Sequence, residues 1–126
     1  MARYDKYSGV TGGSRVPAAA DAATADYDQV LGVGLSVAGR GVLRDPSNSG
    51  FIGVTIVDRT KRRAGDILDV MRSGEIVDVA GLTAGSPVYL TAVGVLTTVK
   101  VGNAARVGYT VEADRLVVNF TSGPEA

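Results

Sequence analysis

The residues best suited to chemistry are four carboxylates within one short stretch, DILDVMRSGEIVDV at 66–79. They are Asp66, Asp69, Glu75 and Asp78. On a helix, acids three residues apart share a face and could hold a cation together. The β-branched residues between them, with Gly65 and Gly74, indicate strands instead, where residues three apart point to opposite faces. The stretch therefore predicts a scaffold segment rather than a catalytic or metal site.

Two arrangements of this stretch remain open. One is a hairpin that turns at residues 71–74, and the other is a single long strand bent at Ser73 and Gly74. Pairing across a hairpin could bring two carboxyl groups within about 10 Å, as in a glycosidase. The sequence has no tryptophan and only 6% aromatic residues, which offers little stacking surface for a sugar.

The composition narrows the possible chemistry further. The 126 residues include no cysteine and no histidine, so disulfides and thiolate sites are excluded, and the commonest general base and zinc ligand are missing. We therefore expect that the protein is not an enzyme and that it binds no cofactor or metal. The chain also has no apolar run of about 18 residues and no secretory signal at its N-terminus, which predicts synthesis in the cytoplasm.

The charges balance overall, with 13 basic and 13 acidic residues, but the sequence KRR at 61–63 is a local basic cluster. A broad basic face is typical of nucleic-acid binders, and three residues do not make one. No direct contact with nucleic acid is expected. Whether Lys61, Arg62 and Arg63 form a subunit contact or a solvated turn stays open at this level.

Residues 1–29 differ in composition from the rest, with little β-branched content and an alanine-rich stretch. This predicts an extended N-terminal arm rather than part of the core. Apolar side chains recur along it at intervals, which suits a segment that becomes ordered against a partner. The candidate contacts are Tyr4, Tyr7, Val10, Arg15 and Val16.

From Val30 onward, short runs of Val, Ile, Leu and Thr alternate with turn residues. Nine candidate strands follow: 30–37, 40–44, 51–58, 66–71, 75–79, 86–91, 94–99, 105–112 and 115–120. Many short strands at close spacing indicate an all-β sandwich or barrel. We predict one β-domain over residues 30–120 and a flexible tail over residues 121–126.

Four segments of this pattern resemble a known family. They are GFIGV (50–54), AGDxxDVMxxGEIV (64–77), TAGSPVYL followed by GxLTT (83–98), and RVGYTVEADRLVVNF (106–120). With the opening MARYDKYSG, they make the chain similar to the head decoration, or capsid cement, proteins of tailed bacteriophages, especially those of actinobacteria. The resemblance covers most of the chain.

The resemblance implies a small β-barrel or β-tulip-like domain of antiparallel strands, usually a homotrimer. Its partner would be the major capsid protein on the outer surface of the expanded head, which it stabilises by bridging capsid subunits. The five arm residues become candidate capsid contacts, and no membrane is involved. The alternative is a tail or fibre β-module that binds a host receptor or glycan.

Overall fold

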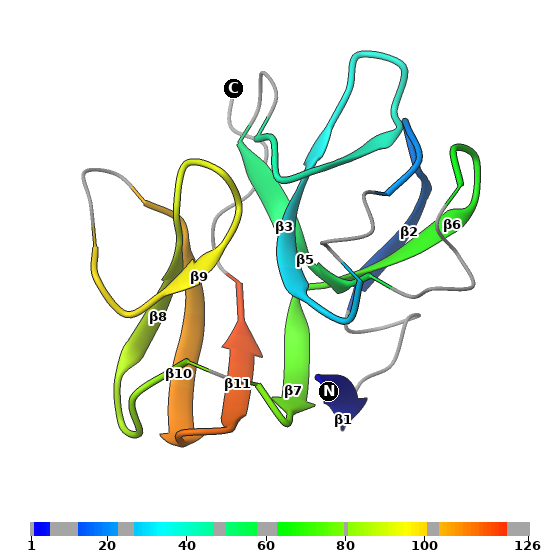
Figure 1. Ribbon diagram of the computed structural model, residues 1–126. Helices are drawn as coiled ribbons and strands as arrows, with labels where there is room; N and C mark the ends of the chain where they lie inside the picture. The colour runs from blue at the N-terminus through cyan, green and yellow to red at the C-terminus, as the bar shows by residue number, and fades with distance from the viewer. Residues whose placement is uncertain are drawn as a thin grey trace.

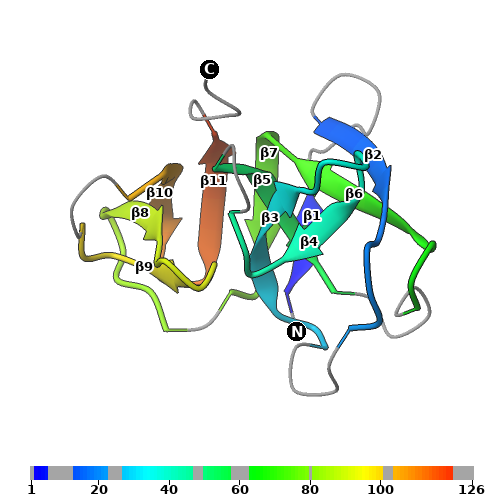
Figure 2. The same ribbon diagram turned by 90° about the horizontal axis from the view of Figure 1, so that it is seen from above.

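A computed structural model describes residues 2–5, 13–22, 27–46, 50–57, 63–79, 81–100 and 104–120. These ranges contain strands and turns and no helix, so the prediction of an all-β chain is confirmed. Within them, no helix is long and apolar enough to cross a membrane. The strands form two antiparallel sheets, which lie side by side in Figures 1 and 2.

The larger sheet, called sheet A, has six strands. Its order is β1 (Arg3–Asp5), β7 (Ser73–Val77), β11 (Arg115–Asn119), β10 (Arg106–Glu112), β8 (Pro87–Leu90) and β9 (Leu96–Thr97). Sheet B has five strands, in the order β2 (Gly13–Pro17), β6 (Ile67–Met71), β5 (Phe51–Ile56), β3 (Val30–Leu35) and β4 (Gly41–Leu43). All nine strands expected from the sequence are present, each within the predicted range or displaced from it by two residues at most.

Sheet B curls until its two edge strands meet. Ala18, directly after β2, forms a parallel bridge with Gly41 at the start of β4, and the Ala19 amide donates to the Gly41 carbonyl at 2.8 Å. The side chains enclosed by this closure are the buried residues Ala18, Val33, Ile52, Leu68 and Val70. Closure gives the edge strands backbone partners that an open sheet lacks. Sheet B is therefore a small barrel-like unit.

The larger hydrophobic core lies between sheet A and the adjoining strands of sheet B. It includes Val54 and Met71 from sheet B with Ile76, Val88 and Leu116 from sheet A, all fully buried. The two sheets are also joined by backbone contacts, because Leu31 of β3 bridges Val95 beside β9. One continuous core thus holds the two sheets together.

The carboxylate-rich stretch crosses from one sheet to the other. Strand β6 belongs to sheet B and β7 to sheet A, and they do not pair with each other, so the hairpin is wrong. The bent strand is confirmed, but its bend lies at Arg72 rather than at Ser73 and Gly74, which belong to β7. Gly74 follows the bend with φ of 129°, a backbone conformation that favours glycine. At the bend itself, Arg72 donates to the carbonyls of Ile52 and Phe120 and lies over the Phe120 ring. This arginine ties the corner to both neighbouring segments.

The described parts of residues 1–29 lie on the β-domain, which differs from the expectation that they stay outside the core. Strand β1 pairs with β7 and strand β2 with β6, each at the edge of its sheet (Figure 1). Ala2 and Ala18 are buried at 6% and 4% exposure. Pairing with a strand already in place compensates for the weak strand propensity of these segments. The division at residue 29 and the tail at 121–126 stay predictions.

Candidate interaction surfaces

The four carboxylates lie on two different sheets and do not converge. Asp66 precedes β6, and its Oδ2 accepts the Arg63 amide at 3.1 Å. Asp69 in β6 pairs with Arg15 at 2.9 Å, and Glu75 in β7 pairs with Arg115 at 3.4 Å. In the described ranges, no three acidic side chains are grouped closely enough to hold a metal ion. The contact of Asp66 supports the start of β6, and those of Asp69 and Glu75 join neighbouring strands.

Tyr4 in β1 faces inward and connects the two sheets. Its hydroxyl accepts a hydrogen bond from the Ile56 amide at 3.0 Å and donates one to the Asp69 carbonyl at 3.1 Å. Its ring packs against the larger core. Tyr4 therefore fastens the N-terminal strand to sheet B, and its side chain is occupied within the molecule.

Replacing Tyr4 with Phe is expected to lower the free energy of unfolding by about 1–3 kcal/mol, because the Ile56 amide and the Asp69 carbonyl lose a partner at a partly buried position. Chemical denaturation followed by circular dichroism measures the change. Tyr89→Phe removes a hydroxyl from the outward side of β8 and serves as the control. An equal effect of the two variants would show that the Tyr4 hydroxyl does not fasten β1.

The other predicted contact residues divide into two groups. Val16 is half-buried and packs on the sheet B interior, whereas the Arg15 side chain is 66% exposed and pairs with Asp69. Tyr7 and Val10 lie outside the described residues, as do Lys61 and Arg62, while Arg63 is exposed. Of the described candidates, Arg15 is the one that presents its side chain to solvent. The role of the five arm residues as capsid contacts stays a prediction.

The outward side of sheet A carries apolar side chains at its centre. We define this outer face by Pro87 and Tyr89 of β8, Arg106, Tyr109, Val111 and Glu112 of β10, and Arg115 and Val117 of β11. Tyr109 is 45% exposed and Val111 50% exposed. Tyr109 lies opposite Pro87 on one neighbouring strand and opposite Val117 on the other. An apolar row therefore crosses three strands on a face that solvent reaches.

Sequence reasoning did not identify this face. In β10 the inward residues, Val107 and Thr110, are not clearly more apolar than the outward residues, Tyr109 and Val111. The sequence of β10 therefore shows no alternation of apolar and polar residues with a period of two. The register of β10 also shifts at each end, between Arg106 and Gly108 and between Thr110 and Glu112. Such bulges change which residues face outward. The available signal for this face in the sequence was the concentration of large apolar residues in the predicted strand 105–112.

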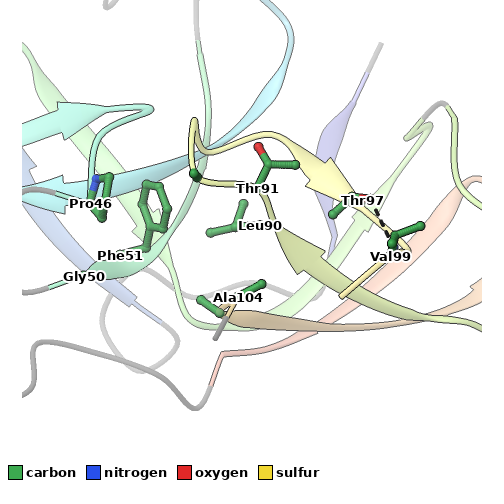
Figure 3. A pocket seen from close by; sticks show the side chains of 10 residues that line it. Pro46, Gly50, Phe51, Leu90, Thr91, Thr97, Val99 and Ala104 are labelled. Carbon is green, nitrogen blue, oxygen red and sulfur yellow. Dashed lines mark hydrogen bonds between the residues drawn. The ribbon is translucent and has the colours of Figure 1, made fainter. Parts of the chain in front are cut away.

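An apolar cavity of about 470 Å³ lies where β5 of sheet B meets the β8–β9 hairpin (Figure 3). Its apolar lining includes the buried Phe51 and Leu90, together with Pro46, Val99 and Ala104. The polar side chains among the described lining residues are Thr91 and Thr97, and none of these residues is ionisable. The cavity can accept an apolar group but offers no acid, base or metal ligand from the described chain.

These features define the class of molecule: an all-β, barrel-like domain whose described surface offers an apolar sheet face and an apolar cavity. The fold is shared with a solved structure from Mycobacterium phage Patience. That chain superposes with a TM-score of 0.90 at 19% sequence identity, over 98% of each chain. No protein-family model matches the sequence, and no curated protein does.

Proposed function

We propose that the chain is a structural virion protein of a tailed phage, specifically a capsid decoration protein on the outer surface of the expanded head. The observation that carries this proposal is the fold shared with a phage chain over 98% of both lengths. The sequence segments at 50–54, 64–77, 83–98 and 106–120 support it independently through their resemblance to head decoration proteins.

The proposed role is to bridge subunits of the major capsid protein after the head expands. A protein that binds the expanded lattice and not the unexpanded one stabilises the expanded state by mass action. Several weak contacts joined in one assembly gain strength from effective concentration, and a homotrimer would supply them. The exposed Arg15 is the described arm residue best placed to contact a partner, because Tyr4 and Val16 pack inward.

Co-sedimentation of the purified chain with capsid shells tests this function. We expect saturable binding to expanded shells of a phage that carries this gene, at a fixed ratio to the major capsid protein, and no binding to unexpanded proheads. Arg15→Ala should weaken the binding. Arg63→Ala replaces an exposed arginine outside the strands and is the matched control.

Absence of binding to either shell would contradict the proposal. In that case, reproducible binding to a glycan array or to host cells would favour the tail or fibre module, since Tyr89 and Tyr109 lie on the outer face of sheet A and could stack on sugars. Equal binding to expanded shells and proheads would retain a capsid role but remove the stabilisation of the expanded state.

A further inference from the structure

The two sheets follow the same strand plan, which is repeated along the chain. Sheet B pairs its strands in the order β2-β6-β5-β3-β4, and sheet A, beyond its edge strand β1, follows the order β7-β11-β10-β8-β9. In chain order, β2 to β6 therefore hold the same places in sheet B as β7 to β11 hold in sheet A. We call β2 to β6 the first unit and β7 to β11 the second unit.

The pairing registers of the two units also match. Val33 lies opposite Gly53 in the first unit, and Val88 lies opposite Gly108 in the second, a shift of 55 residues from 33 to 88 and from 53 to 108. A register shift adjoins this pair in both units. The pairs of the β3–β4 and β8–β9 hairpins coincide under the same shift, and the five pairs between β2 and β6 have counterparts between β7 and β11.

Strands β5 and β10 keep the same residues at matching positions. FIGVTI in β5 and RVGYTV in β10 share a glycine, Gly53 or Gly108, and a threonine, Thr55 or Thr110. Each glycine lies where a Cβ atom would overlap a backbone carbonyl oxygen of the next strand along the chain. The two threonines are the buried polar side chains of the described residues, at 1% and 2% exposure. The second unit thus repeats the first in strand order, register and sequence.

The β3–β4 and β8–β9 hairpins close with the same turn. In the first unit, the Ser36 amide donates to the Arg40 carbonyl at 2.9 Å, and the Ser36 hydroxyl accepts the Arg40 amide at 3.1 Å. In the second, the Thr91 amide donates to the Val95 carbonyl at 2.8 Å, and the Thr91 hydroxyl accepts the Val95 amide at 3.2 Å. The fourth residue of each turn is a glycine with positive φ: Gly39 at 78° and Gly94 at 74°.

These turns, residues 36–40 and 91–95, are the two hairpin tips, and both carry exposed apolar residues. Val37 is 95% exposed and Val93 is 54% exposed, and each is next to an exposed alanine. The turn requires its hydroxyl residue and its glycine but no apolar residue between them, and exposed turn positions favour polar residues. Both tips lie at the upper end of the molecule in Figure 1. The Arg44 Nε donates to the Val93 carbonyl at 3.3 Å and holds the second tip against the end of β4.

We propose that the two hairpin tips contact equivalent apolar sites on two subunits of the major capsid protein, one site for each tip. This inference rests on the proposed capsid role and names the residues that bridge the subunits, Val37 and Val93. A shell of identical subunits presents one receiving site many times, and the duplicated unit presents the same kind of tip twice. Each contact buries an exposed valine, and two contacts held in one molecule strengthen each other through effective concentration.

Co-sedimentation of the full chain with expanded capsid shells tests this contact. Val37→Asp and Val93→Asp should each weaken binding by about tenfold or more, because a carboxylate enters an apolar site only at a large desolvation cost and the gain from effective concentration is lost. The variant with both changes should bind more weakly than either. Ala113→Asp places the same charge at an exposed alanine in the β10–β11 turn, at the lower end of the molecule in Figure 1, and should bind like the unaltered chain.

Thermal unfolding followed by circular dichroism shows whether each variant keeps its fold. Where an aspartate lowers the melting temperature, Val37→Thr and Val93→Thr, which preserve the shape of the side chain, take its place. The inference is overturned, and the capsid role retained, if the unaltered chain binds expanded shells and both single variants bind equally well. A loss from one tip alone overturns the two-site contact. An unaltered chain that binds neither expanded shells nor proheads contradicts the capsid role itself, and this inference with it.

Discussion

Replacing Gly108 with alanine is expected to cause the largest loss of stability of any single methyl addition at a described glycine. A Cβ atom at this position would lie 1.9 Å from the carbonyl oxygen of Val117 in the paired strand β11. The atom in the way belongs to the backbone, so a side-chain rotation cannot relieve the overlap. We expect the free energy of unfolding to fall by about 3 kcal/mol or more.

Gly39→Ala is the matched control for this prediction. Gly39 has φ of 78°, but no atom lies within 4 Å of the place that a Cβ would occupy, so alanine there introduces backbone strain without a clash. The expected cost is about 1–2 kcal/mol. Denaturant unfolding of the two variants compares the effects. If the Gly108→Ala variant proved as stable as the Gly39→Ala variant, β10 and β11 would not be paired as described.

Leu116→Ala is expected to destabilise the protein by about 2–5 kcal/mol. Leu116 is fully buried in the larger core and lies opposite Ile76, which is also fully buried. Alanine removes apolar contacts from both sides of this pair and leaves a cavity that the surrounding strands can fill only in part. Thermal or denaturant unfolding at low protein concentration gives the change without a contribution from association.

The neighbouring substitution Val117→Ala tests the same strand on its opposite side. Val117 lies on the outer face, half-buried, so its shortening should cost less than about 1 kcal/mol. The contrast between adjacent residues checks which side of β11 faces the core. A larger loss for Val117→Ala than for Leu116→Ala would reverse the assignment of the two faces of sheet A.

The sequence was sufficient to place the nine strands after Val30 because each has strong β propensity and is bounded by turn residues. It did not predict β1 and β2. Arg3–Asp5 and Gly13–Pro17 have weak intrinsic strand preference, and their partners lie far along the chain: Arg15 is opposite Asp69. Such pairing is decided by the sheets already present rather than by local sequence. Deleting residues 1–16 would therefore remove β1 and most of β2. Such a truncation would damage the fold, so it does not test capsid binding by the arm alone.

The candidate surfaces were less predictable than the strands. The sequence showed that Asp66 and Asp69 should not converge, because the alternation of a strand separates them. It could not show that β6 and β7 enter different sheets, since a bend at Arg72 and a hairpin share the same turn residues. Nor could it identify Tyr109 as the centre of the outer face, because the register shifts that orient Arg106 and Glu112 arise from pairing with β8 and β11.

The most direct test of the proposed role is a cryo-electron microscopy reconstruction of the mature head of a phage that carries this gene. We expect density for the two-sheet domain on the outer surface of the shell, in contact with more than one major capsid subunit, and absent from unexpanded proheads. Density for this fold only in the tail, or a mature shell without it, would contradict the proposed role.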